Sequence, residues 1–279
     1  MMKERIQFKN MVTERLSHID PDVLAFNKDE FWTIQREYEY IEYYSIEKRL
    51  MNTALALHLA VGLHNGSYRK STITKNNQTY KLPYVIHCLW VCRMLADLSV
   101  PVTHDEEDIL LASALCHDMI EDVDFADGGR ELYTKYGLDP QIYKIVKLLS
   151  KRYDFTDEQE HAFFHHIECN KLALLVKLSD RCHNVEDLYN RPSWKVHEYV
   201  GETRKFFIPM CEYGLEHYDD INTTLQILHE KLINLTQAAE VLVDRYDQRK
   251  EALLKELDRL QEEHKHLRQE WEALWNESE

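Results

Sequence analysis

The stretch ILLASALCHDMIED, residues 109–122, decides how this chain folds. Apolar residues fill most of its first eight positions, and this density predicts a helix buried inside the molecule. His117 and Asp118 lie at the end of the apolar run, where a charged or imidazole side chain needs a partner. Glu121 and Asp122 follow about one helical turn later and lie near the same point. The stretch therefore combines a core helix with four groups that can bind a cation or move a proton.

The same helical texture extends outward along the chain. Thr103, with Glu106 three residues later, predicts the start of a helix from Asp105 to Met119. The apolar run from Ser45 to Leu63 predicts one buried helix. Only 7 glycines and 6 prolines occur in 279 residues, so few turns are forced and long helices are expected. Further helices are expected at residues 4–18, 29–49, 139–151, 157–168, 170–189 and 194–215.

A single β-hairpin is the only β structure expected. Residues 72–81 place a Thr/Ile/Tyr-rich arm on each side of Asn76-Asn77, a pair typical of tight turns. Pro83 is expected to begin the next helix, which carries His87. The predicted fold class is therefore all-α, a helical bundle into which one short hairpin is inserted.

The chain changes character at about residue 221. From Leu225 onward apolar residues recur every three or four positions, and no glycine or proline follows Gly214. The spacing predicts one or two long helices with a stutter in a heptad pattern. Two interpretations stay open for this segment: an amphipathic helix docked on its own domain, and a coiled coil that joins copies of the chain. The expected division is an N-terminal helical extension over residues 1–45, a central domain over 46–220 and the long helical segment over 221–279.

Composition and charge restrict the partners. The formal net charge of −15 argues against nucleic-acid binding, because affinity for phosphate backbones needs clustered Lys and Arg. No stretch approaches the roughly 18 apolar residues that span a bilayer, and the first residues contain no apolar signal core. The six cysteines are scattered without a CxxC pair, which indicates reduced thiols and a cytoplasmic protein.

Three separate segments supply four candidate metal ligands. His87, the adjacent pair His117 and Asp118, and Asp180 all lie in or at the end of apolar helical runs. Two imidazoles and two carboxylates suit a divalent cation such as Mn²⁺, Fe²⁺ or Zn²⁺, and such a cation suits phosphate-ester hydrolysis. Taken singly, His87 is more typical of a hydrogen-bonded core histidine, and Asp180 is equally typical of an ion pair with Arg181. The combination of all four favours the metal site.

The segments around these residues resemble a known family. In chain order they are His64-x-Gly66-x-x-Arg69-Lys70-Ser71, Pro83-Tyr84-x-x-His87, Ala114-Leu115-x-His117-Asp118-x-x-Glu121-Asp122 and Lys177-Leu178-x-Asp180-Arg181-x-His183-Asn184. Their order and spacing resemble the HD-domain phosphohydrolases. More narrowly, they resemble the guanosine tetra/pentaphosphate (alarmone) hydrolase domain of the RelA/SpoT homologue family, in its small hydrolase-only type. The resemblance covers about residues 46–215.

The resemblance implies a fold, a metal and a reaction. The fold is an all-helical HD-domain bundle. The metal, usually Mn²⁺, is held by His87, His117, Asp118 and Asp180. The reaction removes the 3′-pyrophosphate of the nucleotide and yields GDP or GTP plus pyrophosphate, a step of the stringent response.

The resemblance also assigns residues to catalysis and to the substrate. Glu121 and Asp122 position or activate the attacking water. Arg69, Lys70 and Ser71 face the nucleotide and its phosphates. Asn184 faces the ribose. The guanidinium fork of Arg69 matches phosphate geometry.

The chain departs from the family pattern beside the expected base site. Residues 72–82 intervene where family members continue almost directly from Ser71 to the Pro-Tyr segment, and Cys88 follows His87 where the family has proline. Two alternatives therefore stay open. The same metal centre can serve another nucleotide, such as a deoxynucleotide, NADPH or a cyclic dinucleotide, or the chain is a non-catalytic nucleotide sensor that signals through its C-terminal helix. The intact ligand set favours an enzyme.

Overall fold

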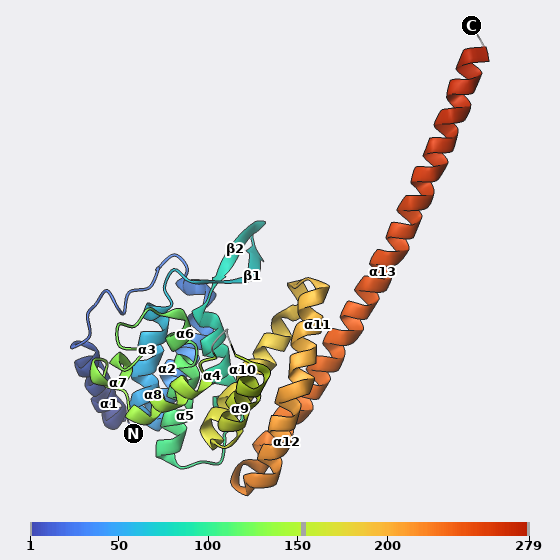
Figure 1. Ribbon diagram of the computed structural model, residues 1–279. Coiled ribbons are helices and arrows are strands. Elements are labelled where there is room, and N and C mark those ends of the chain that lie inside the picture. The colour runs from blue at the N-terminus through green and yellow to red at the C-terminus, as the bar shows by residue number, and fades with distance from the viewer. Residues whose placement is uncertain (1, 152–154, 278–279) are drawn as a thin grey trace.

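The computed structural model describes residues 2–151 and 155–277, and it confirms a mostly helical fold with one short hairpin and a long C-terminal helix. Figure 1 shows a body of packed helices and a single helix that projects far beyond it. None of the described helices is both long enough and apolar enough to cross a membrane.

The body is a bundle of helices around one apolar core. Four largely buried helices form its centre: α3 (Met51–Leu63), α4 (Val85–Asp97), α5 (His104–Cys116) and α10 (Lys171–Glu186). Apolar residues occupy most sides of these helices, as expected for helices enclosed by others. Shorter or more polar helices surround them: α1 (Met2–Leu16), α2 (Gln35–Lys48), α7 (Glu131–Thr134), α8 (Pro140–Leu149) and α9 (Asp157–Glu168). The segments that carry the predicted ligands therefore meet inside the bundle.

α5 begins at the capping box predicted from the sequence. The Thr103 hydroxyl accepts a hydrogen bond from the backbone N–H of Glu106, whose side chain accepts one from the backbone N–H of Thr103. The helix ends at Cys116, however, and not at Met119 as predicted. His117 caps it, and Asp118 caps the short helix α6 (Met119–Asp122). These two residues thus lie on a turn between helices, where both side chains reach the same point.

The run predicted as one helix over residues 45–63 is broken. α2 ends, Arg49 adopts a left-handed backbone with φ of 59°, and α3 then starts. The carboxylate of buried Asp108, on α5, accepts hydrogen bonds from the backbone N–H groups of Asn52 and Thr53 at 2.9 and 2.8 Å. A side chain from another helix therefore caps α3, and this explains why no local pattern predicts where it starts.

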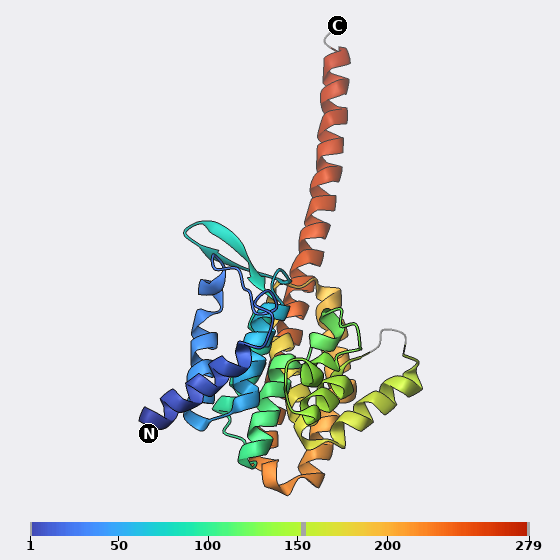
Figure 2. The same ribbon diagram turned by 90° about the vertical axis from the view of Figure 1, so that its left-hand side faces the viewer.

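The hairpin is longer than predicted. β1 (Tyr68–Lys75) and β2 (Gln78–Pro83) pair antiparallel around Asn76 and Asn77. Their φ angles of 51° and 60° are those that tight two-residue hairpin loops prefer. Because β2 includes Pro83, α4 starts two residues after it and not at Pro83 as predicted. Figures 1 and 2 show the hairpin projecting from the body, with its base near the start of α4.

A single helix, α13 (Asn222–Glu277), forms the C-terminal segment. Its first half packs against α10, α11 (Ser193–Glu202) and α12 (Ile208–His217). Leu225, Leu228 and Leu232 are fully buried there. From Tyr246 to Trp271 its large apolar side chains are exposed, and Figure 1 shows this second half leaving the body. The first half is therefore docked on its own domain, whereas the second half extends into solvent.

Candidate metal centre

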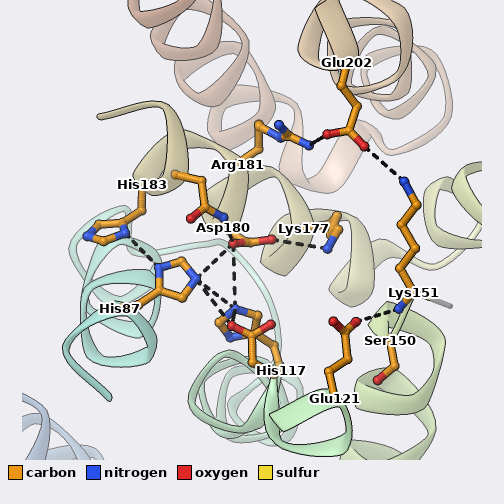
Figure 3. Close-up of polar contacts among 12 residues, drawn as sticks. His87, His117, Glu121, Ser150, Lys151, Lys177, Asp180, Arg181, His183 and Glu202 are labelled. Atoms are coloured by element: carbon orange, nitrogen blue, oxygen red, sulfur yellow. Dashed lines mark hydrogen bonds and ion pairs between the residues drawn. The ribbon is translucent and has the colours of Figure 1, made fainter. Parts of the chain in front are cut away.

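Four side chains from three parts of the chain converge on one point in the bundle. The Nε2 atom of His117 lies 3.2 Å from Nε2 of His87 and 3.0 Å from Oδ2 of Asp118. The Nε2 atom of His87 lies 3.0 Å from Oδ1 of Asp180. Figure 3 shows His87, His117 and Asp180 turned toward one another. Helix α4 supplies the first ligand, the α5–α6 turn the next two and α10 the last, so the fold brings all four predicted ligands together.

The spacing of these atoms fits a metal ion. A divalent ion of this class lies about 2.1 Å from nitrogen and oxygen ligands, so neighbouring ligand atoms lie roughly 3.0–3.5 Å apart. The distances between His87, His117 and their nearest carboxylate oxygens fall in this range. His87, His117 and Asp118 also place one ligand atom each within 4.8 Å of one another. Two nitrogens and two oxygens suit Mn²⁺, Fe²⁺ and Zn²⁺ alike.

Outer hydrogen bonds orient both imidazoles. The Nδ1 atom of His117 lies 2.8 Å from the carbonyl oxygen of Ala114, which can only accept. Nδ1 therefore carries a proton, and Nε2 is the ring nitrogen that faces the cluster. The Nδ1 atom of His87 lies 2.8 Å from Nδ1 of His183 on α10. Contacts of this kind hold metal-binding imidazoles in place.

The pKa values of His117, Asp118 and Asp180 show how these side chains affect one another. Burial disfavours a charged His117, but the charge of Asp118 and hydrogen bonds to Asp118 and Asp180 outweigh it and raise the pKa of His117 well above its usual value. Burial also disfavours the charged carboxylates. For Asp118 the charge of His117 outweighs burial, and for Asp180 that of Lys177 does, so both carboxyl pKa values are lowered. The cluster is thus built to surround a positive charge.

Asp180 is held by neighbours on its own helix. Its Oδ2 atom lies 3.2 Å from Nζ of Lys177, and its Oδ1 atom accepts a 2.5 Å hydrogen bond from Nδ2 of Asn184. Arg181, the ion-pair partner considered from the sequence, donates instead to Glu202. The buried carboxylate is therefore balanced by Lys177 and the histidines, as Figure 3 shows.

Tyr84 and the carboxylates of α6 border the ligands. The Tyr84 hydroxyl donates a 2.7 Å hydrogen bond to Oδ2 of Asp118. Oε1 of Glu121 accepts a 2.6 Å hydrogen bond from the backbone N–H of Lys151. The Asp122 side chain is exposed, but the surrounding protein partly desolvates its carboxyl group. This desolvation and the negative charge of Asp118 raise the pKa of Asp122 to about 6. Such a carboxyl group exchanges protons near neutral pH.

A single carboxylate ties the base of the hairpin to α10. Nη2 of Arg69 lies 2.8 Å from Oδ2 of Asp187, and the Ser71 hydroxyl donates to the same carboxylate at 2.6 Å. Nη2 of Arg69 also lies 3.4 Å from Oδ1 of Asn184, which binds the ligand Asp180. Arg69, Ser71 and Asn184, three of the predicted substrate-binding residues, thus lie next to the candidate metal ligands. Lys70 is exposed, and strand alternation turns it to the opposite face of β1 from its neighbours.

A cleft of about 420 Å³ opens beside the cluster. Its volume lies within the roughly 300–1,000 Å³ typical of small-molecule sites. Its charged lining consists of five carboxylates and three cations: Asp118, Glu121, Glu160, Asp180, Glu202, Lys151, Lys177 and Arg181. Three cations beside a metal cluster form a setting that suits a phosphorylated ligand.

Relatives of the chain occur among plants. A protein of Oryza sativa subsp. japonica described as "Putative GTP diphosphokinase RSH1, chloroplastic" is 27% identical over 170 residues, which are 56% of this chain and 17% of the rice protein. The chain is similar to RSH1. A protein of Arabidopsis thaliana with the same description is 26% identical over 238 residues, which are 73% of this chain and 25% of the plant protein. No protein-family model matches the chain.

The similarity to RSH1 is weak and partial. The chain spans a quarter or less of the length of these curated relatives. At this level the RSH1 similarity supports the RelA/SpoT family indicated by the motifs.

Several contacts of the centre were not predicted. The spacing in the sequence could have predicted the contacts of Lys177 and His183. These residues lie three positions before and after Asp180 and therefore share its helix face. No local pattern could have predicted the contact of Asp187, because its partner Arg69 lies 118 residues away. Contacts of this second kind depend on tertiary packing alone.

Proposed function

We propose that this chain is a metal-dependent phosphohydrolase that removes the 3′-pyrophosphate of guanosine tetra- or pentaphosphate. The products are GDP or GTP and pyrophosphate. One observation carries the proposal: His87, His117, Asp118 and Asp180 meet at metal-ligand spacing beside a cleft whose lining includes carboxylates and three cations. The RSH1 relatives are named for an activity on GTP, and this supports a guanine nucleotide as the substrate class. The hydrolytic direction rests on the metal centre.

The four ligands would hold one divalent ion, Mn²⁺ by the family resemblance. When bound, such an ion polarises a phosphoryl oxygen and lowers the pKa of water, so that hydroxide is available at neutral pH. The contacts of Tyr84, Lys177 and His183 keep the ligand atoms in place before any ion arrives. This preorganisation reduces the rearrangement that binding requires.

The carboxylates of α6 would handle the protons. Asp122 is the better proton acceptor, because its pKa of about 6 lies close to neutral pH. Glu121 is fixed by the N–H of Lys151 and is therefore suited to orienting the attacking water. The proton that Asp122 takes from water would then pass to the leaving 3′-oxygen of the nucleotide.

Cations on the cleft wall would receive the phosphates. Lys151, Lys177 and Arg181 line the cleft and are balanced by carboxylates in the structure. Arg69 and Asn184 adjoin the same cluster and would contact the nucleotide. Positive charge placed before the reaction stabilises the negative charge that grows on the phosphoryl oxygens.

The test is pyrophosphate release from guanosine tetraphosphate by metal-stripped protein with and without Mn²⁺. We expect release that requires Mn²⁺ and that falls more than about 100-fold in kcat/KM in Asp118→Asn. The matched control is Asp124→Asn, which changes an exposed carboxylate six residues away and should keep the wild-type rate. Equal rates in the two variants would contradict the assignment of Asp118.

One structural feature favours a second candidate substrate. The strand that carries Arg69 and Ser71 continues into the projecting hairpin, beside the expected base site. A pocket altered there would accept another nucleotide with the same metal centre. Mn²⁺-dependent turnover should therefore be compared for guanosine tetraphosphate, a deoxynucleoside triphosphate, NADPH and a cyclic dinucleotide. Preference for any of the last three would replace the guanosine substrate and retain the phosphohydrolase.

A further inference from the structure

The second half of α13 carries an apolar face that the body does not cover. We call this face the seam. It consists of six side chains, each 49–64% exposed: Tyr246, Leu253, Leu257, Leu260, Leu267 and Trp271. Four of them recur every seven residues, and the other two fall between at heptad spacing. At 100° per residue the six lie within an arc of roughly 80°, so they form one continuous stripe.

The other faces of this half carry mainly charged side chains, and several of these form ion pairs with one another along the helix. Lys255 pairs with Glu251, and Arg259 with Glu256, both at 2.7 Å. Pairs three or four residues apart support a helix only modestly. A long helix in water gains most of its stability by packing an apolar face. The seam is therefore the face that a partner would cover.

The seam leads into a groove at the base of the projecting helix. The groove has a volume of about 650 Å³, with Leu235, Leu242 and Tyr246 of α13 on one side. Its other side is formed by Leu188, of the short helix η2 (Asp187–Asn190), and Val196 of α11. Leu235 and Leu242 fall within the same 80° arc as the seam. The wall of the groove therefore stands on the seam side of α13.

We propose that a second copy of α13 covers the seam and runs antiparallel to the first. The groove wall decides the orientation. In a parallel pair, the first half of one α13 would run alongside the first half of the other. The groove wall of each chain would then occupy the same space as the first half of the partner's α13. In an antiparallel pair the bodies lie at opposite ends, and the C-terminal end of each helix points toward the partner's groove. The two chains would then form a two-stranded coiled coil with two-fold symmetry.

In an antiparallel overlap the seam pairs apolar residues with apolar residues at its centre and at its two ends. With the overlap centred between residues 258 and 259, Leu257 packs on Leu260 of the partner. Tyr246 packs on Trp271 of the partner, at the mouth of the groove. The pairing of these layers is reciprocal, as a two-fold interface requires. In the same register Leu253 lies opposite His264 of the partner and Leu267 opposite Lys250 of the partner, so the purely apolar layers are those at the centre and at the two ends of the overlap.

The flanking charges agree with the antiparallel register. Arg249 meets Glu270 of the partner, and Asp247 meets Arg268 of the partner. Each attractive pair occurs twice by symmetry. The contact between Glu256 and Glu263 is repulsive, so favourable flanking pairs outnumber unfavourable ones two to one. Charges beside the seam set partner choice and orientation in coiled coils.

Sedimentation of the full chain over a wide concentration range tests the dimer. We expect wild type to be dimeric and Leu257→Glu/Leu260→Glu to be monomeric. The matched control, Gln248→Glu/Gln269→Glu, adds the same charge to the opposite face of the helix and should stay dimeric. Turnover of the monomeric variant is recorded alongside, so that loss of the dimer is distinguished from loss of folding. A monomeric wild type, or a dimeric seam variant, would overturn the proposal.

Spin labels test the orientation. Cys169 is the exposed cysteine, so a Cys169→Ser background leaves the five buried thiols unlabelled. In an antiparallel pair, labels at Asp258→Cys lie within about 20 Å, whereas labels at Gln269→Cys are roughly 30 Å or more apart, from a rise of 1.5 Å per residue. Short distances at both positions would establish a parallel pair and refute the antiparallel one.

Discussion

At the scale of single residues, side-chain chemistry is set by the partner as much as by the residue type. Arg69 is suited to phosphate, yet its side chain is only 7% exposed and binds Asp187. A bound phosphate would have to share the guanidinium with that carboxylate. His117 likewise becomes a candidate ligand because the Ala114 carbonyl fixes its Nδ1 proton. Residue types were predictable here, and the Ala114 contact is local, whereas the pairing of Arg69 with Asp187 joins residues 118 positions apart and depends on packing.

His64 gives a prediction for stability against pH. Burial lowers the pKa of His64 to about 4, from 6.5 in a free histidine. Between these values the unfolded chain binds a proton that the folded chain does not, so the folded state loses stability as the pH falls from 6.5 toward 4. The loss from His64 alone reaches about 3 kcal/mol at pH 4.

Urea unfolding between pH 7 and pH 4 measures this effect. The slope of the unfolding free energy against pH should be smaller in His64→Gln by about 1 kcal/mol per pH unit near pH 5. His166→Gln removes an exposed histidine and should retain the wild-type slope. An unchanged slope in His64→Gln would show that this histidine does not titrate as burial requires.

At the scale of elements, helix ends proved harder to predict than helices. The capping box of Thr103 and Glu106 gave the start of α5 correctly, because both partners are local in sequence. The end of α5 and the start of α3 were wrong. In both cases the side chains or backbone at the helix end contact residues at least 30 positions away: His117 contacts His87 and Asp118 contacts Tyr84 at the end of α5, and Thr53 contacts Asp108 at the start of α3. Local patterns do not contain such contacts.

Asp108 gives the prediction at this scale. Asp108→Ala should lower the unfolding free energy by about 2–4 kcal/mol, because it leaves the first N–H groups of α3 and the Thr53 hydroxyl without their buried acceptor. Asp105→Ala, in the exposed first turn of α5, should change it by about 0.5 kcal/mol or less. Chemical denaturation of both variants makes the comparison. Similar losses in the two would mean that Asp108 does not join α3 to α5.

At the scale of the whole molecule, one core unites distant parts of the chain. Its buried residues run from Ile19 and Ile41 near the N-terminus to Leu232 on α13. The candidate metal ligands lie where α4, α10 and the turn after α5 meet. Binding of an ion there should therefore stabilise the fold as a whole.

Thermal unfolding of metal-stripped protein tests this link. Mn²⁺ at 100 times its dissociation constant should add about 2.7 kcal/mol of stability, which raises Tm by roughly 5–10 °C. Asp118→Asn should lose most of this rise, and Asp124→Asn should retain it. A wild-type Tm that does not respond to Mn²⁺, Fe²⁺ or Zn²⁺ would contradict the metal site.

The sequence by itself determined the helical class, the hairpin turn at Asn76-Asn77 and the identity of the four candidate ligands. These depend on periodicity, turn chemistry and residue type, all of which are local. Only the tertiary structure decided that the ligands lie about 3 Å apart, that Asp187 binds Arg69, and that half of α13 leaves the body. Such features join residues far apart in the chain, and no local pattern encodes the packing that brings them together.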